Sequence, residues 1–367
     1  DQGEEQRTHA GQPEQRDGAV QRLQQGLRNA EEARLFEQEE IDAARDESAG
    51  HDHNAADAVG IVDRRAHDNR PAHGMPHQNV RFWQNRRELL HRKSQVVCVI
   101  LEVAHIAFQR VSHQAARKTF LDGGSEFEIN LAYQQATGQR EAQAPYHSII
   151  GVNEHAGTLH YQYYDTEAPA PPRSLLIDAG VRFRGYCSDI TRTTPGAGER
   201  RFSALIQGLE QLQQRLCGMV APGVEYVAIH RKTHQGIAAL LNAAGVVQGV
   251  DDETLVEQGV TRAFFPHGIG HFLGVQVHDV SGKKEPPPSD APFLRLTRTL
   301  EAGMVVTIEP GLYIIPSLLD PVLDGPLGKN FNRSVIDELR GCGGIRIEDN
   351  VVVTHDGARN LTREAGG

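Results

Sequence analysis

The segment over residues 174–193, SLLIDAGVRFRGYCSDITRT, constrains the fold more than any other part of the chain. It holds two extended runs separated by a turn-prone stretch, which is typical of a β-hairpin. A hairpin centred between Phe183 and Arg184 places Asp178 directly opposite Asp189, with Cβ atoms about 4.5–5.5 Å apart. Two carboxylates this close beside buried strands need a cation or a shared proton. We therefore predict a metal site here; the alternative is a solvent-exposed acidic hairpin.

Length, charge and cysteine content limit the class of protein. The chain has 367 residues, enough for two or three domains and a large core. A formal net charge of −10 argues against nucleic acid or an anionic membrane surface as the main partner. No run of about 20 apolar residues and no secretory signal pattern is visible. The cysteines, Cys98, Cys187, Cys217 and Cys342, lack metal-site spacing, so we expect free thiols and a cytoplasmic location.

The first part of the chain, residues 1–112, differs in composition from the rest. Gln, Arg, His, Asp and Glu dominate it, and residues 1–92 contain no Lys, Tyr or Cys. Low hydrophobicity with high polarity is typical of disorder, and the helical pattern over 23–44 has too narrow an apolar stripe for a core. We expect an atypical, poorly ordered segment, for which a shifted reading frame is one possible origin, followed by a folded domain over 113–367.

The predicted folded domain begins with two helices separated by a glycine pair. Ser125 and Glu128 form a capping-box pattern at the start of the second helix. Phe127, Leu131 and Tyr133 are expected to provide the apolar contacts of this helix.

Further along the chain, helices and strands are predicted in two similar halves. Leucines at helical spacing over 202–219 predict one helix, and 224–244 predicts another. Apolar runs over 304–315 and 341–354 predict strands. Pairs of helices between strands indicate an α+β fold.

Three histidines lie close together in FFPHGIGHFLGVQVHDV: His267, His271 and His278. A zincin helix is excluded, because the Glu of HExxH is missing and two glycines disfavour a helix. A single buried histidine is usually only hydrogen-bonded within the core. Three of them amid apolar sequence favour a functional site.

Two glutamates interrupt sequences that otherwise read as buried strands: Glu309 in TIEPG and Glu348 in IRIEDN. Unpaired carboxylates are costly in such positions. Arg346 lies two residues before Glu348 and therefore faces the same side of its strand. One site can be composed of five side chains: Asp178, Asp189, His271, Glu309 and Glu348. Such oxygen-rich ligation suits Mn²⁺, and four negative charges favour two metal ions.

From about residue 113 to its end, the chain resembles the metallopeptidases of pita-bread fold, and among them the bacterial Xaa-Pro dipeptidases, or prolidases. Four motifs carry the resemblance, in the order of the family: LLIDAG with SDITRT, FFPHGIGHFLGVQVHDV, VVTIEPGLY and GGIRIEDNVV. Organophosphorus acid anhydrolase shares these motifs. The resemblance implies a pita-bread catalytic domain that hydrolyses Xaa-Pro dipeptides and releases proline. It also implies two Mn²⁺ ions per subunit, or other divalent ions such as Co²⁺, with a bridging hydroxide as the nucleophile.

The resemblance implies a role for each metal ligand. Asp178 would hold one ion, and His271 and Glu309 would hold the other. Asp189 and Glu348 would bridge the two ions.

The resemblance also implies residues that act on the substrate. His267 and His278 match histidines that contact the substrate and stabilise its reacting carbonyl. Arg346 matches a site arginine that pairs near Glu348 or with the substrate carboxylate, and Glu309 would shuttle a proton to the proline nitrogen. Three further residues match the substrate pocket: Tyr146, His160 and Tyr226.

Two features depart from the family pattern. Residues 1–112 show no likeness to the N-terminal domain that shapes the pocket and builds the family's homodimer, and the Pro-rich loop between His278 and Glu309 is short. Four alternatives to a dipeptidase remain: an aminopeptidase of the same fold acting on longer peptides, a phosphotriester hydrolase, a non-catalytic peptide-binding protein and a truncated, non-functional product.

Overall fold

The computed structural model describes residues 109–365. The expectation of a poorly ordered segment over 1–112 therefore falls almost entirely outside the described residues. Residues 109–121 are helical, so the expected domain boundary between residues 112 and 113 lies within a helix. Among the described helices, none is long and apolar enough to cross a membrane.

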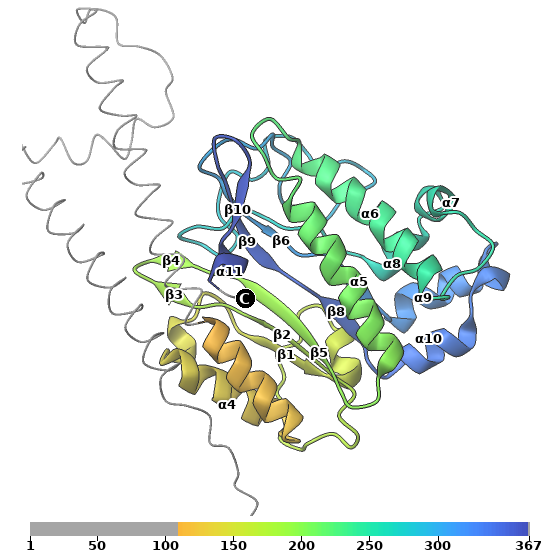
Figure 1. The fold of residues 1–367 in the computed structure, drawn as a ribbon, viewed down its shortest axis with the longest axis horizontal. Helices are drawn as coiled ribbons and strands as arrows, with labels where there is room; N and C mark the ends of the chain where they lie inside the picture. Colours follow the sequence, from red (N-terminus) through yellow and green to blue (C-terminus); the bar gives the residue numbers. More distant parts are fainter. Residues whose placement is uncertain (1–108, 366–367) are drawn as a thin grey trace, which may run out of the picture. The chain divides into compact units, whose positions relative to one another are not determined.

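The first half of the fold is an antiparallel sheet with two helices packed on it (Figure 1). Its strands, in spatial order, are β1 (Ile149–Val152), β2 (Ser174–Ala179) and β5 (Ile190–Pro195). The helices are residues 109–121 and α4 (Glu126–Thr137). The predicted capping box is confirmed, since the Ser125 hydroxyl and the Glu128 carboxylate each accept a hydrogen bond from the backbone N–H of the other residue.

The inner face of α4 differs from the predicted one. Ile129 and Tyr133 are buried against the sheet. The prediction that Phe127 and Leu131 make core contacts was wrong, because these side chains are 43% and 47% exposed. Residues four apart share one helix face, so packing Ile129 and Tyr133 inward turns the other pair toward the outside.

The predicted hairpin joins β2 to β5, but with a different register. Two short strands continue it: β3 (Arg182–Phe183) and β4 (Tyr186–Cys187). The turn consists of Arg184 and Gly185, which both have positive φ angles (50° and 93°). Asp178 is therefore opposite Thr191, and the predicted direct pairing with Asp189 was wrong. Asp189 lies two residues from Thr191, so both carboxylates still face the same side of the sheet.

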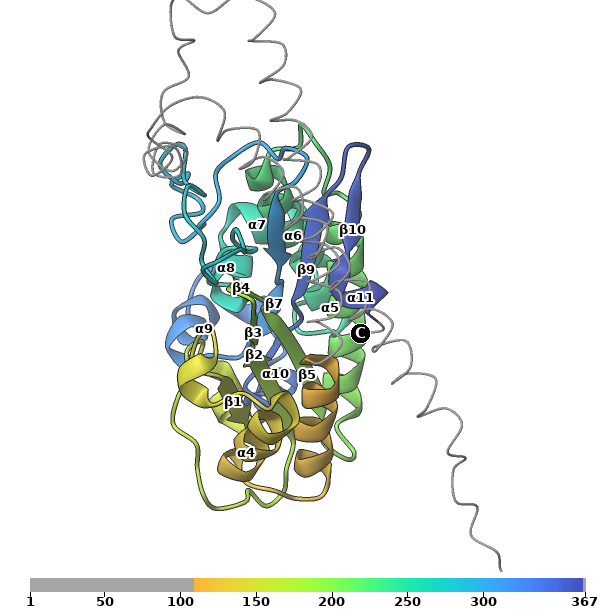
Figure 2. The ribbon, with the colours of Figure 1, turned by 90° about the vertical axis from the view of Figure 1, so that its left-hand side faces the viewer.

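The second half is a sheet with two long helices beside it (Figures 1 and 2). Its strands, in spatial order, are β10 (Ala358–Asn360), β9 (Asp349–Val353) and β6 (Val305–Ile308). The helices are α5 (Arg200–Cys217) and α6 (Tyr226–Ala243), within two residues of their predicted bounds.

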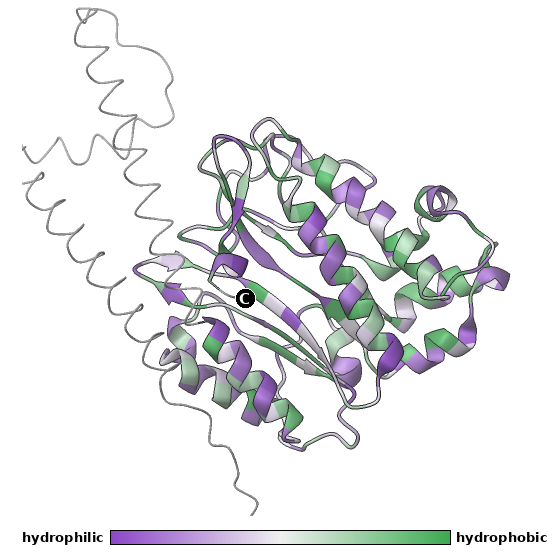
Figure 3. Ribbon diagram, viewed as in Figure 1, coloured by the Kyte–Doolittle hydropathy of each residue, from purple (hydrophilic) through white to green (hydrophobic). Residues whose placement is uncertain are grey.

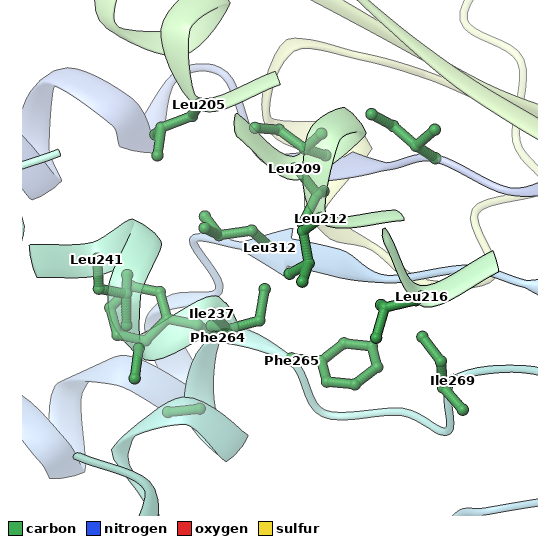
Figure 4. Close-up of a cluster of buried hydrophobic side chains, with 14 of the residues drawn as sticks. Leu205, Leu209, Leu212, Leu216, Ile237, Leu241, Phe264, Phe265, Ile269 and Leu312 are labelled. Atoms are coloured by element: carbon green, nitrogen blue, oxygen red, sulfur yellow. The ribbon is translucent and has the colours of Figure 1, made fainter. Parts of the chain in front are cut away.

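The largest cluster of buried apolar side chains belongs to this second half (Figure 4). It includes the inner face of α5, formed by four leucines at helical spacing: Leu205, Leu209, Leu212 and Leu216. Figure 3 shows hydrophilic and hydrophobic residues alternating around α5, as expected for a helix with one buried face. This core packs α5 and α6 against the strands that flank two of the predicted metal ligands, Glu309 and Glu348.

The two predicted strands over 304–315 and 341–354 are each interrupted at a glutamate. Two strands lie beyond the interruptions: β7 (Gly311–Tyr313) and β8 (Gly344–Arg346). β6 pairs with β9 and β7 with β8 in one continuous register, in which Glu309 falls opposite Glu348. Pro310 has no N–H for a ladder at this point. The two glutamates therefore share one face of the sheet at the gap between the two ladders.

The remaining described elements are shorter and lie around the two sheets. The α-helices are α7 (Asp252–Glu257), α8 (Val260–Phe264), α9 (Pro316–Leu323), α10 (Arg333–Arg340) and α11 (Leu361–Glu364). The 3₁₀ helices are η1 (Glu141–Gln143), η2 (Asn153–Gly157) and η3 (Gly328–Asn330). All described strand pairs are antiparallel, and the predicted α+β fold is confirmed.

Candidate metal centre

The structure brings the predicted metal ligands together where the two halves of the fold meet. His271 Nε2 lies 3.4 Å from Asp189 Oδ2 and 3.6 Å from Glu309 Oε1. Donor atoms of Asp189, His271 and Glu348 all lie within 4.8 Å of one another, and these three residues are buried. The backbone N–H of Glu348 donates to a carbonyl of β5, which ties the two sheets together at this point.

Tyr146 connects the fifth predicted ligand to this group. Its hydroxyl lies 2.7 Å from Asp178 Oδ1 and also contacts Asp189 Oδ1. A single hydroxyl proton cannot satisfy both carboxylates. The two aspartates therefore have capacity for a further positive partner.

His271 is oriented by its own backbone segment, which runs alongside β6. The N–H of Thr307 donates to the His271 carbonyl at 3.0 Å. Gly270 allows this close approach, because a Cβ atom there would lie 2.3 Å from the Thr307 carbonyl oxygen. The His271 Nδ1–H donates to the Phe272 carbonyl at 2.9 Å, which leaves Nε2 as the ring nitrogen that faces the carboxylates. This is the tautomer that a metal-binding histidine needs.

The carboxylates are crowded and buried. Burial, and then the charges of Asp189 and Glu309, raise the pKa of Glu348 well above its usual value. Burial also raises the pKa of Glu309, which stays at about 7 because His271 and Arg346 act in the opposite direction. Glu348 Oε2 accepts a hydrogen bond from Thr191, but Oε1 is buried and has no hydrogen-bond partner in the described part of the chain.

These observations test whether metal ions fit the site. A buried carboxylate oxygen without a donor is rare and costly. The four carboxylates and one imidazole are hard oxygen ligands and a borderline nitrogen ligand, the donor set that suits Mn²⁺. The residues present therefore fit the two divalent ions that were predicted.

Arg346 is held by protein groups on three sides. It donates to Asp178 Oδ2 at 2.6 Å, to the Tyr313 hydroxyl at 2.7 Å and to the Thr191 hydroxyl at 3.2 Å. Burial raises the pKa of Asp178, but the Arg346 charge together with the hydrogen bonds from Tyr146 and Arg346 lowers it overall. Arg346 thus pairs mainly with a metal ligand on β2, and reaches Glu348 only through the Thr191 hydroxyl.

The two other predicted histidines lie on different sides of this group. His267 has both ring nitrogens engaged, since Nδ1 donates to the Gly268 carbonyl at 2.8 Å and Nε2 accepts from the Tyr313 hydroxyl at 2.9 Å. Burial, and then Arg346, lower its pKa to about 3, so the ring is neutral. His278 is exposed, and its ring packs edge-on against the ring of His271, with 4.4 Å between the ring centroids.

The three predicted pocket residues differ in their surroundings. Tyr146 lies between the two aspartates, and the exposed His160 follows η2. Tyr226 is fully buried, and its hydroxyl donates to the Thr307 carbonyl at 2.6 Å. Its position braces β6 beneath the site.

Sequence reasoning missed two residues of the network, Thr191 and Tyr313. Both lie inside motifs already identified, SDITRT and VVTIEPGLY. Thr191 is two residues from Asp189 and therefore faces the same side of the sheet, a signal that alternation alone provides. Tyr313 is fully buried, and only the tertiary structure shows that its hydroxyl joins His267 to Arg346.

A second carboxylate–histidine group, Glu126, His155 and Asp165, has a different character. Glu126 already accepts hydrogen bonds from two backbone N–H groups and from the Tyr161 hydroxyl, and its Oε1 lies 2.9 Å from His155 Nδ1. Its oxygens are thus satisfied by the protein, and we interpret this group as structural.

Comparison with known proteins places the chain in a family. A sequence model of metallopeptidase family M24 matches residues 97–355. The chain belongs to metallopeptidase family M24. This confirms the family predicted from the four motifs, and the match begins upstream of residue 113.

Relatives within family M24 include proteins named Xaa-Pro dipeptidase. That of Marinobacter nauticus is 76% identical over 252 residues, which cover 69% of this chain and 59% of the relative. The protein of the same name from Edwardsiella ictaluri is 48% identical over 259 residues, which cover 69% of this chain and 58% of the relative. The chain thus spans about three-fifths of the length of the curated relatives it matches.

Similar solved structures, which are aminopeptidases P, confirm the pita-bread fold. Aminopeptidase P from E. coli with the inhibitor Pro-Leu superposes with a TM-score of 0.59 at 27% identity, covering 72% of this chain and 55% of that one. Aminopeptidase PepP of Pseudomonas aeruginosa superposes with a TM-score of 0.57 at 29% identity, and the match covers 72% of this chain and 56% of that one.

Proposed function

We propose that this chain hydrolyses Xaa-Pro dipeptides with two divalent metal ions, most simply Mn²⁺, and releases the C-terminal proline. The observation that carries the proposal is the buried, partnerless Oε1 of Glu348 within a ring of carboxylates beside His271 Nε2. The identity of 76% to a protein named Xaa-Pro dipeptidase supports this substrate class.

The proposed ligands divide as the motifs imply: Asp178 on one ion, His271 and Glu309 on the other, Asp189 and Glu348 on both. When bound, the ions supply a water molecule of lowered pKa that is nucleophilic at neutral pH. Arg346 holds the Asp178 carboxylate in place, and Thr191 holds that of Glu348.

Other side chains handle the proton and the substrate. The proline nitrogen must gain a proton when its bond breaks, and we propose that the Glu309 carboxylate relays it from the attacking water. His278 is proposed to donate to the substrate carbonyl oxygen. His267 has no free ring nitrogen, so it is proposed to form a wall of the pocket fixed by Tyr313.

Substrate contacts are proposed for Tyr146 and His160. The amide before proline is tertiary and has no N–H, so recognition has to rely on shape and on the two termini of the dipeptide. Tyr226 is proposed as a support of β6, because it is fully buried and bonded to the strand. We also propose that the catalytic domain includes the whole helix over residues 109–121.

The test is to measure metal content and peptide cleavage on the full chain. Metal-depleted protein is reloaded with Mn²⁺ and assayed with Leu-Pro, Leu-Pro-Gly and Leu-Gly, and bound Mn²⁺ per chain is determined by elemental analysis. We expect two ions per chain and preferential cleavage of Leu-Pro. Faster cleavage of Leu-Pro-Gly would instead support the aminopeptidase activity named for the structural relatives.

A matched pair of variants tests the site itself. His271→Asn should remove one metal ion and reduce turnover by at least about a hundredfold, because a direct ligand is lost. His155→Asn, in the second carboxylate–histidine group, should keep both ions and the activity. Normal Mn²⁺ content and turnover in His271→Asn would refute the proposed centre.

A further inference from the structure

A cavity of about 170 Å³ lies behind the metal-ligand strands, between the helix over residues 109–121 and the sheet of β2 and β5. It is lined by Arg110, His113, Gln114, Arg117, Ile177, Ile190, Arg192, Thr194 and Thr362. The proposed peptidase reaction does not use any of these residues.

The cavity and the metal centre share the same two strands. Ile177 lines the cavity while its neighbour Asp178 faces the metal centre, and Ile190 lines the cavity while Asp189 faces the centre. Successive side chains of a strand point to opposite faces, so the cavity lies one sheet thickness behind the ligands. On this side the lining combines Ile177 and Ile190 with Arg192 and Thr194.

His113 lines the cavity, but neither of its ring nitrogens is exposed to it. It is 8% exposed, and neither ring nitrogen has a hydrogen-bond partner within residues 109–365. The nearby Ala179 carbonyl accepts from Gln109 instead. Burial, and then the charge of Arg192, lower the pKa of His113 to about 3, although the Ala179 carbonyl acts in the opposite direction. The ring is therefore neutral and adds no charge to the cavity lining.

The cavity lining also carries positive charge, from three arginines. Arg192 is neutralised by Asp349, whose Oδ1 lies 2.7 Å away. Arg110 contacts only the Ala365 carbonyl, at 3.3 Å, and Arg117 is exposed; among the described residues neither has a carboxylate partner. Two guanidinium groups without a carboxylate partner in residues 109–365, at one side of a partly apolar cavity, are complementary to an anion.

We propose that this cavity binds a small organic carboxylate with a short apolar chain. The carboxylate would accept from Arg110 and Arg117, and the apolar part would pack on Ile177 and Ile190. An inorganic anion would leave the isoleucine wall unused, and a neutral molecule would leave the two guanidinium groups unpaired.

The probe is isobutyrate, titrated by ligand-observed NMR and calorimetry into the full chain loaded with Mn²⁺. Isobutyramide has the same shape without the charge, and inorganic phosphate has charge without the apolar chain. We expect isobutyrate to bind at least about tenfold more tightly than either, since a charged hydrogen bond contributes about 1.5–3 kcal/mol. Equal affinity for the amide, or tighter binding of phosphate, would overturn the assignment.

Variants locate the bound carboxylate. Arg117→Gln should weaken isobutyrate binding about tenfold, and Lys118→Gln, the same charge change one residue along the helix and outside the cavity lining, should leave it unchanged. A carboxylate held by the metal ions would be insensitive to Arg117→Gln, and that result would refute the cavity as the site.

Discussion

Replacing Glu348 by glutamine should separate metal binding from folding. Glu348 is 1% exposed, its Oε1 has no partner in the described part of the chain, and it is proposed to contact both ions. In metal-free protein, the variant should unfold at the same temperature as the wild type or higher. The amide cannot ionise, so no charge has to be buried, and its oxygen can still accept from Thr191.

The effect of Mn²⁺ on unfolding should differ strongly between the two proteins. One ion at 100 times its Kd stabilises the native state by about 2.7 kcal/mol. At about 2–4 °C per kcal/mol for a domain of this size, each site should raise Tm by about 5–11 °C. If the variant binds Mn²⁺ a hundredfold more weakly, the same Mn²⁺ concentration stabilises it by only about 0.4 kcal/mol, which raises its Tm by about 1–2 °C. Differential scanning calorimetry with and without Mn²⁺ measures both shifts.

Glu126→Gln is the control for this experiment. Glu126 is also a buried carboxylate, but it accepts several protein hydrogen bonds, so its loss should lower Tm with and without Mn²⁺ by similar amounts. The Mn²⁺-induced shift should stay at its wild-type size in this variant. If Glu348→Gln also kept the full shift, the reasoning about the metal centre would be wrong.

Two further predictions concern pH and backbone packing. In metal-free protein the pKa of Glu309 is raised from 4.5 to about 7, so its protonated form stabilises the fold below about pH 4.5 and this contribution is lost as the pH rises through about 7. Mn²⁺ needs the carboxylate, so the Mn²⁺-induced Tm shift should fall between pH 8 and pH 5.5; a constant shift in calorimetry would contradict this. Gly270→Ala should destabilise the protein by about 1–3 kcal/mol and reduce Mn²⁺ uptake, because the added Cβ meets the Thr307 carbonyl. Gly357→Ala, where no atom lies within 4 Å, should change neither denaturant midpoint nor Mn²⁺ content.

The sequence was sufficient to predict the hairpin, but the register predicted for it was wrong. Its existence followed from two extended runs around a turn-prone stretch, but its register depended on which two residues occupy the turn. Arg184 and Gly185 both adopt positive φ, and a glycine in the second position is a recognised signal for such a turn. Reading that signal would have placed Asp178 opposite Thr191.

The proposed ligands could be identified because charge is conspicuous in apolar strands. Glu309 and Glu348 interrupt buried runs, and no local rule of strand formation favours a carboxylate there. Contacts among uncharged or paired residues were not predictable in this way. The link from His267 through Tyr313 to Arg346 joins segments far apart in the sequence, and only their packing brings them together.

The unbroken register across Glu309 and Glu348 restricts how this protein can change by insertion or deletion. Adding one residue to either strand near the gap would turn one glutamate to the opposite face and offset its partner. The fold tolerates single substitutions at other positions. A change in the length of one of these two segments, in contrast, has to be matched by a change in the other. We therefore expect length differences among close relatives to accumulate in connecting loops, such as the one between His278 and β6.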